Sequence, residues 1–452
     1  MSKERTSRMR SRRAWRGIAG VAAGVLLAGG GLAVANASTV GETKAAAVKR
    51  PVDKNAKGVA AVVSAANAFL NTLDSDQQTS TVLDFSQANA TAWSNLPCGS
   101  SCRPGIGFGT LTDDQLAAAE HVLKVALGSG KDTGYEHVLQ TLKADDVLAA
   151  AEASGSDSTG TSAEPTDSAS TSASESASDS ASDSASDSAE PADSASDTAS
   201  DSADPSASAS ATDLPTGTPP SGGAGGSGGG PGGFSYGSGS YYLAFLGTPS
   251  ADGTWQLHFG GHHLAVNITY KDGKVAGASP FFTGVEPTSW TADDGTTYAP
   301  LAKFRDGLLK VTGSLSTGQL AEAKLSESFG DVLLGPGQDG KFPETKEGVK
   351  VGELSPKQQK LVLAAIHPWV ADVDDATADR LMKTYAKELS QTYVAYSGGT
   401  GLDTQGDYVR IDGPGVWIEF VCQNGVVYRD QIHYHTVYRD HTRDYGSEFS
   451  FS

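Results

Sequence analysis

The stretch YVRIDGPGVWIEFVCQNGVVYRDQIHYHTV, residues 408–437, contains three strand-like segments separated by turn residues. Apolar, β-branched and aromatic residues alternate or run together at 408–412, 416–422 and 426–437. Runs of this kind are typical of β-strands when turn residues bound them. Asn424-Gly425 is also a strong signal for a tight hairpin turn. The stretch therefore predicts antiparallel strands in the C-terminal half of the chain.

A two-residue loop at Asn424-Gly425 would define how the last two segments pair. Counting outward from such a loop places Glu419 opposite Asp430 and Val416 opposite His433. Two facing carboxyl groups raise each other's pKa and suit acid/base chemistry. A slip of one residue would separate the two groups, so this pair depends on the register.

Further strand-like segments lie upstream at 241–246, 255–259 and 263–270. Helical patterns lie between the strand groups. From Lys57 to Ala151 apolar residues also recur at helical spacing. We therefore expect an α+β fold in which a helical N-terminal half packs on a mostly antiparallel sheet with additional helices. The additional helices are expected at 317–325, 356–366 and 376–389.

One local motif occurs four times, with leucine first, a short polar residue second and glutamine fifth. This pattern is a capping box, in which the polar residue and the glutamine satisfy two free amides at a helix start. We interpret the glutamines as structural rather than catalytic. The motifs begin at Leu73, Leu111, Leu315 and Leu354.

The segment 154–240 is built almost entirely from Ser, Ala, Asp, Gly, Thr and Pro, with 13 Asp and Glu residues and no Lys or Arg. Such a composition cannot bury enough apolar surface to offset the entropy lost on ordering. We expect a disordered, low-complexity acidic insert between a helical half at 58–153 and an α+β half at 241–452. Its composition fits a linker between two domains as well as a surface loop within one.

The N-terminus has the layout of a secretory signal peptide. Residues 1–16 contain seven Lys and Arg, an Ala- and Gly-rich apolar run follows at 18–35, and Ala35-Asn36-Ala37 fits a cleavage site. Ser11-Arg12-Arg13-Ala14-Trp15 resembles a twin-arginine signal, and ordinary Sec export is the alternative. We expect a signal peptide at 1–37, a flexible mature N-terminus at 38–57, no stable membrane span, and a secreted or cell-envelope protein.

Export permits disulfide bonds, and the chain has three cysteines. Cys98 and Cys102 are separated by Gly99-Ser100-Ser101, which is able to close a small ring. Cys422 lies in an apolar strand. Three pairings are open, and we favour a Cys98–Cys102 bond with Cys422 buried and free.

Several function classes do not fit the sequence. The formal net charge is -19 and no basic cluster follows the N-terminal leader, so nucleic acid is not an expected partner. Gly398-Gly399-Thr400-Gly401 is not followed by the lysine of a phosphate loop, and we expect no nucleotide cofactor. There is also no Gly-x-Ser-x-Gly motif of a serine hydrolase.

Two histidine clusters suggest a transition-metal site. His433 and His435 share one face of a strand, and Gly260-Gly261 permits a bulge that re-aims the histidines next to it. If the two strands are neighbours, several imidazoles converge, which suits copper or zinc. The alternative is that these histidines only form hydrogen bonds within the fold. The candidate ligands are His258, His262, His263, His433 and His435.

The C-terminal segment contains two arginines and two aspartates in alternation. Asp440 is a candidate second-shell residue that would orient a histidine or complete the metal shell. The reading that we favour is an ion-pair ladder of Arg439, Asp440, Arg443 and Asp444 that fixes the C-terminal tail.

Several of these motifs together resemble the family DUF3500, a family of proteins of unknown function. The resemblance covers about residues 58–150 and 241–446. It implies one domain interrupted by the acidic insert, and histidine clusters that belong to the family pattern. It assigns no activity. At Ser447 the family more often has a second glycine. The motifs are His258-Phe259-Gly260-Gly261-His262-His263-Leu264, Arg410-Ile411-Asp412-Gly413-Pro414, His433-Tyr434-His435-Thr436, Asp444-Tyr445-Gly446 and Trp93-Ser94-Asn95-Leu96-Pro97.

The sequence therefore predicts an exported protein with a histidine-rich pocket for copper or zinc. If the metal does chemistry, an open coordination position would activate water or bind dioxygen. Two alternatives remain. One is a metal-independent hydrolase or lyase with His433 or His435 as base and Arg410 or Arg439 holding an anionic substrate. The other is a non-catalytic cell-envelope binding module for an unknown small molecule.

Overall fold

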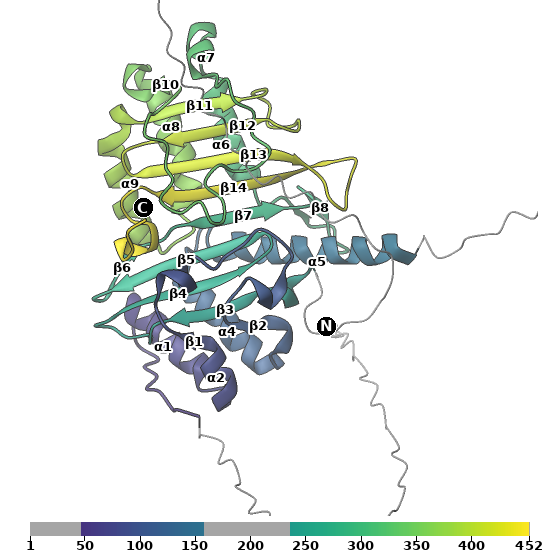
Figure 1. Cartoon of the computed structure of the whole chain (residues 1–452), viewed down its shortest axis with the longest axis vertical. Helices are drawn as coiled ribbons and strands as arrows, with labels where there is room; N and C mark the ends of the chain where they lie inside the picture. The colour runs from purple at the N-terminus through teal and green to yellow at the C-terminus, as the bar shows by residue number, and fades with distance from the viewer. Residues whose placement is uncertain (1–46, 158–235, 452) are drawn as a thin grey trace, which may run out of the picture. The chain divides into compact units, whose positions relative to one another are not determined.

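The structure is a computed structural model that describes residues 47–157 and 236–451 (Figure 1). These residues belong to one compact unit. The predicted signal peptide at 1–37 and most of the predicted insert lie outside the described residues. No helix in the described ranges is long and apolar enough to cross a membrane.

A large sheet forms the centre of the fold, and its main path runs β1-β3-β4-β5-β7-β14-β13-β12-β11-β10. Apart from the parallel pair β1–β3, its strands pair antiparallel, as the sequence predicts. The strands are β1 (Val82–Leu83), β2 (Ile106–Gly107), β3 (Tyr242–Leu246), β4 (Thr254–Gly261), β5 (Leu264–Lys271), β6 (Lys274–Gly277), β7 (Phe281–Val285), β8 (Trp290–Thr291), β9 (Thr297–Tyr298), β10 (Val349–Lys350), β11 (Tyr393–Ser397), β12 (Tyr408–Asp412), β13 (Val416–Asn424) and β14 (Ile432–Asp440).

Helices cover one face of this sheet. One buried core joins Phe69 of α1 to Phe245 and Trp255 of the strands, so the helical half packs on the sheet and the predicted α+β architecture is confirmed. The described helices are α1 (Val59–Leu70), α2 (Ser75–Thr81), α3 (Gln87–Ala90), α4 (Asp113–Ala126), α5 (Tyr135–Asp157), α6 (Ala302–Thr312), α7 (Thr317–Ala323), α8 (Pro356–Val370) and α9 (Asp375–Glu388).

The opposite face of the sheet lies under two segments without long helices or strands, which we call the covering segments 84–105 and 324–348. In the first, Trp93 packs on Phe282 of β7. In the second, the amides of Leu333 and Leu334 donate to the carboxylate of Glu419 in β13. Side chains on this face of β13 and β14 are therefore enclosed between the sheet and a covering segment.

Most elements of the fold occur twice in the same order. The set α1, α2, β2, α4, α5, β3, β4, β5 and β7 is followed by α6, α7, β10, α8, α9, β11, β12, β13 and β14. Outward from the central pair, the order β7-β5-β4-β3 corresponds to β14-β13-β12-β11. The short strands also correspond, because Ile106 pairs with Leu243 of β3 and Val349 pairs with Val394 of β11. The chain is thus built from two structural repeats.

All four predicted capping boxes are present, at Asp74, Thr112, Ser316 and Ser355. Their glutamines also contact one another in pairs. Gln115 Nε2 donates to Gln77 Oε1 at 3.0 Å, and Gln358 Nε2 donates to Gln319 Oε1 at 2.8 Å. Each repeat therefore contains one pair of boxes, which explains why the motif occurs four times.

The predicted two-residue hairpin loop at Asn424-Gly425 is wrong. Asn424 pairs with Ile432, which places Val416 opposite Asp440 and Glu419 opposite Val437. The loop is longer than predicted, and its backbone amides bind a carboxylate from another part of the chain. The N–H groups of residues 426–428 donate to the carboxylate of Glu286. Glu419 and Asp430 therefore form no carboxylate pair.

Part of the predicted flexible segment 38–57 is attached to the first repeat. The amide of Val48 donates to Gln78 Oε1 at 3.0 Å, and the amide of Arg50 donates to Asn71 Oδ1 at 2.8 Å. The amide of Asp53 donates to Ser64 Oγ at 2.9 Å. These bonds hold residues 48–53 along α1, which corrects the prediction for this part of the segment.

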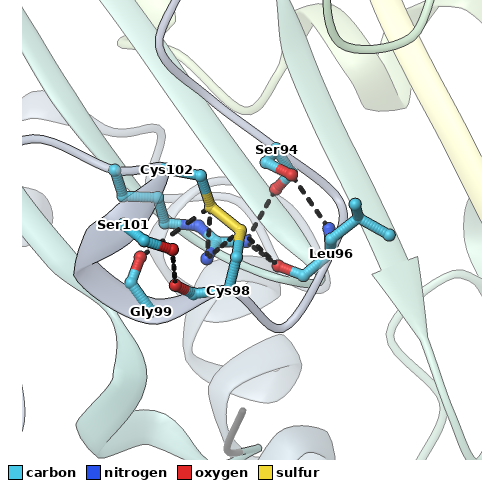
Figure 2. The surroundings of a disulfide bond; sticks show 7 residues. Ser94, Leu96, Cys98, Gly99, Ser101 and Cys102 are labelled. Atoms are coloured by element: carbon cyan, nitrogen blue, oxygen red, sulfur yellow. Dashed lines mark hydrogen bonds between the residues drawn. A yellow bond between two sulfur atoms is a disulfide. The ribbon is translucent and has the colours of Figure 1, made fainter. Parts of the chain in front are cut away.

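A disulfide bond joins Cys98 and Cys102 in the first covering segment (Figure 2). Beside it, Arg103 donates to the carbonyl of Ser94 at 2.8 Å and to the carbonyl of Leu96. Cys422 is free and buried, and burial raises the pKa of its thiol to about 12. The thiol of Cys422 therefore stays protonated and is a poor metal ligand at neutral pH.

Candidate metal centre

The two predicted histidine clusters meet at one end of the sheet. His262 and His263 form the turn between β4 and β5, and His433 and His435 lie at the start of β14. The strand β7 lies between β5 and β14, and Gly284 of β7 pairs with His435. Because Gly284 has no side chain, the imidazoles approach one another above it. The ring centroids of His263 and His435 are 5.8 Å apart.

Three of these histidines form a compact group that could hold a metal ion. One ligand nitrogen from each of His263, His433 and His435 lies within 4.8 Å of the other two. The Nε2 atoms of His433 and His435 are 3.3 Å apart. All three side chains are buried.

Two carboxylates lie within hydrogen-bond distance of the Nδ1 atoms of His263 and His435. Asp145 of α5 lies 2.8 Å from His263 Nδ1, and Asp331 of the second covering segment lies 2.9 Å from His435 Nδ1. An ionised carboxylate only accepts hydrogen bonds, so each Nδ1 carries the proton and each Nε2 keeps its lone pair. This arrangement, with a carboxylate behind a histidine, is the one that orients histidine ligands in metal sites.

The third histidine, His433, is held differently. Its Nδ1 is 3.9 Å from Glu286 Oε2, which is too long for a hydrogen bond, and the ring lies near the backbone of Asn424. Burial, with the nearby His435 and His263, lowers the pKa of His433 to about 2. The imidazole is therefore neutral at physiological pH and offers a lone pair.

A second group of Asp145, His262 and His263 could also hold a metal ion. His262 Nδ1 lies 3.0 Å from Asp145 Oδ2, and the same oxygen accepts a hydrogen bond from Tyr241. Burial acts to raise the pKa of Asp145, but the two histidines lower it overall, so the carboxylate is ionised. These distances fit hydrogen bonds, and Asp145 therefore acts as a shared acceptor for both histidines.

The structure does not bring His258 to this group. His258 pairs with Ala244 of β3 and Asn267 of β5, and two strands separate β4 from β14. It lies near Gln256 and the backbone of Ala92, and burial lowers its pKa to about 4. His258 is thus a core histidine, and the expectation that it joins the ligands is not met.

Asp440, the predicted second-shell residue, also lies elsewhere. Alternate side chains of a strand point to opposite faces, so Asp440 and His435 face opposite sides of β14. The carboxylate of Asp440 accepts hydrogen bonds from Tyr385 and Arg443 instead. Arg439 pairs with Asp444 at 3.0 Å. The two arginines and two aspartates form crossed ion pairs at the tail.

The two arginines that were predicted to hold an anionic substrate form ion pairs and hydrogen bonds within the fold instead. Arg439 is fully buried and donates to the carbonyl of Leu334 and to the carboxylates of Asp339 and Asp444. Arg410 is also buried and pairs with Glu347 at 3.0 Å. Neither arginine forms a contact with the histidine group in the described part of the chain.

Sequence reasoning did not identify Asp145, Asp331, Gly284 or Glu286. Asp145 had a usable signal, because it is an acidic residue in the apolar pattern of a helix. Asp331 lies in a covering segment without periodicity, and its position follows only from the tertiary structure.

Replacing Gly284 with Ala is expected to weaken metal binding. A Cβ at this position would lie 2.5 Å from His263 Cδ2 and 2.9 Å from His435 Cδ2, so both imidazoles must move. Disturbing the orientation of ligands costs roughly tenfold to a hundredfold in affinity, judged from outer-shell substitutions. Competition with a chromophoric chelator measures this. Gly318→Ala, where a Cβ meets nothing within 4 Å, is the matched control, and equal affinity of both variants would contradict the geometry.

The family comparison agrees with the resemblance seen in the sequence. The family model described as "Protein of unknown function (DUF3500)" matches residues 55–447. The search of curated proteins and the search of solved structures returned no match. The matched region contains both repeats and every residue of the histidine group. The chain belongs to the DUF3500 family.

Proposed function

We propose that this protein is an exported transition-metal protein whose ion is bound by His263, His433 and His435. One observation carries the proposal. The Nε2 atoms of His433 and His435 are 3.3 Å apart. Two nitrogens bound to one tetrahedral ion at roughly 2.0–2.1 Å lie about 3.3–3.4 Å from each other. The pair thus has the spacing that a shared ion requires.

A direct hydrogen bond between these imidazoles explains the arrangement less well. N–H donors usually lie about 2.7–3.2 Å from oxygen acceptors, and the 3.3 Å between the two Nε2 atoms is long by that measure. One such bond would also leave the His263 lone pair in the group without a donor. A metal ion uses all three lone pairs at once. The carboxylates of Asp145 and Asp331, behind two of the ligands, are the second-shell groups that such an ion favours.

The ligand set favours zinc or copper. Imidazole nitrogen suits both ions, whereas magnesium and calcium prefer oxygen ligands. Three protein ligands leave a fourth position for a water molecule or a small exogenous ligand, as in catalytic rather than structural zinc sites. The predicted signal peptide and the Cys98–Cys102 disulfide support an extracytoplasmic location.

The metal content of the exported protein tests this proposal. The full chain is expressed with its N-terminal leader intact, and the mature form is purified without chelators and analysed by mass spectrometry for metals. We expect about one zinc or copper ion per chain. His258→Ala is the control, because this buried histidine lies outside the group. Absence of any ion, after loading with zinc and with copper in turn, rejects the proposal.

A further inference from the structure

The helical layer of the second repeat contains a groove that is separate from the histidine group. It has a volume of about 520 Å³ and lies between α6, α8 and α9. Its floor is apolar and includes Leu361, Ala364, Pro368 and Met382. In Figure 1 these three helices lie beside the strands β11 to β14. A cavity of this size is in the range that holds a small molecule.

The first repeat has the same groove between α1 and α4. The end of α1 at Asn71 corresponds to the end of α6 at Gly313, and the Thr112 cap corresponds to the Ser355 cap. Counting from these positions, five lining residues of one groove match five of the other. They are Ala61, Ala65, Ala68, His121 and Val125 in the first repeat, and Lys303, Gly307, Lys310, Ala364 and Pro368 in the second.

In the first repeat the protein's own chain forms one wall of the groove, which has a volume of about 490 Å³. Val52, Asp53 and Ala56 line it, from the segment that leads into α1. Side chains of α1 hold the backbone of this segment. Asn71 Nδ2 donates to the carbonyl of Arg50 at 2.8 Å, and Ser64 Oγ donates to the carbonyl of Asp53 at 2.9 Å. These side chains therefore hold an extended segment of the chain along α1.

In the second repeat the segment that leads into α6 takes another path. It forms the β8–β9 hairpin, where Tyr298 contacts Lys143 of α5. The positions that hold the backbone in the first repeat have also changed. Asn71 corresponds to Gly313 and Ser64 to Asp306, which pairs with Arg305. The groove of the second repeat thus lacks this wall and the side chains that bind a peptide backbone in the first repeat.

Two alanines that line the first groove, Ala61 and Ala68, correspond to the cationic residues Lys303 and Lys310 in the second. Lys303, Lys310 and Lys360 line the groove, together with His367. Among the described residues that line it there is no carboxylate. The chain as a whole has a formal net charge of -19, so a lysine-lined apolar groove departs from its general character. Lys310 and Lys360 are exposed at its rim. This combination complements a molecule with an apolar body and an anionic end.

We propose that the groove between α6, α8 and α9 binds an amphipathic carboxylate, with the apolar chain on Leu361 and Met382 and the carboxylate near Lys310 and Lys360. Decanoate is the probe, measured by titration calorimetry on the mature protein below its micellar concentration. Decanol, of the same chain length but uncharged, is the comparison ligand. We expect decanoate to bind and decanol to bind at least about tenfold more weakly, because it lacks the charge-assisted contacts.

Substitutions of groove residues test whether decanoate binds between α6, α8 and α9. The double variant Lys310→Glu, Lys360→Glu is expected to bind decanoate at least about tenfold more weakly, since two attractive charges become repulsive. Lys357→Glu, an exposed lysine of α8 outside the groove, is the matched control and keeps the wild-type affinity. Met382→Gln keeps the size of the side chain and also weakens binding. Absence of decanoate binding, equal binding of decanol, or an unchanged affinity of the double variant each overturns the proposal.

Discussion

His433→Ala is expected to lower the affinity for the metal ion by roughly two to three orders of magnitude. Structural zinc sites with four protein ligands bind the ion with about 10–16 kcal/mol at neutral pH, so one ligand contributes on the order of 2.5–4 kcal/mol. Because the imidazole points into the group from β14, its removal leaves the sheet pairing unchanged. Competition with chelators of graded affinity, on wild type and variant side by side, measures the change.

Two further variants control this prediction. His258→Ala removes a buried histidine of the same sheet outside the group, and its metal affinity should equal that of the wild type. Asp331→Asn keeps the shape of the carboxylate that holds His435 but weakens its hydrogen bond, and a loss of roughly tenfold to a hundredfold is expected. If His433→Ala retains wild-type affinity, or if His258→Ala loses as much, the assignment of the ligands is wrong.

Arg439→Ala is expected to lower the free energy of unfolding by about 3–5 kcal/mol, because removing one partner leaves buried charges unpaired. The guanidinium lies 3.0 Å from both Asp339 and Asp444. It also donates to the carbonyls of Leu334 and Gly335, which attaches the second covering segment to β14. Chemical denaturation of the metal-free protein at neutral pH measures the loss.

The same substitution distinguishes a structural arginine from one that binds substrate. Arg439→Lys keeps one charge but not the several directed bonds, and we expect an intermediate loss of stability with metal affinity unchanged. Arg429→Ala removes an exposed arginine of the 425–431 loop and serves as the control, with a change within about 0.5 kcal/mol. A wild-type stability of Arg439→Ala would contradict the role that its contacts indicate.

The sequence predicted the fold class and the helix starts, because these depend on local patterns. The four capping boxes place Asp74, Thr112, Ser316 and Ser355 at helix N-caps, where the structure has them. The hairpin after β13 was mispredicted because Gly425 begins a longer loop whose amides bind Glu286, a residue far away in the sequence. Ser447 has a φ of 61°, a backbone conformation that glycine adopts more readily than serine.

The histidines of the candidate centre were predictable from their spacing, but their partners were not. His433 and His435 share a strand face, and Gly260-Gly261 indicates a special turn beside His263. The exclusion of His258 depends on the order of four strands, which no local pattern contains. Asp145 and Asp331 come from a helix and a covering segment on different sides of the sheet. The contacts of these two carboxylates with the histidines could be identified only from the tertiary structure.

The position of the ion itself tests the account most directly. Crystals of the mature protein loaded with zinc, or with copper, are measured at the absorption edge of the metal. We predict one anomalous peak at about 2.0–2.1 Å from the Nε2 atoms of His263, His433 and His435. A peak beside His258 or at the protein surface, or no peak with either metal, would contradict a three-histidine centre.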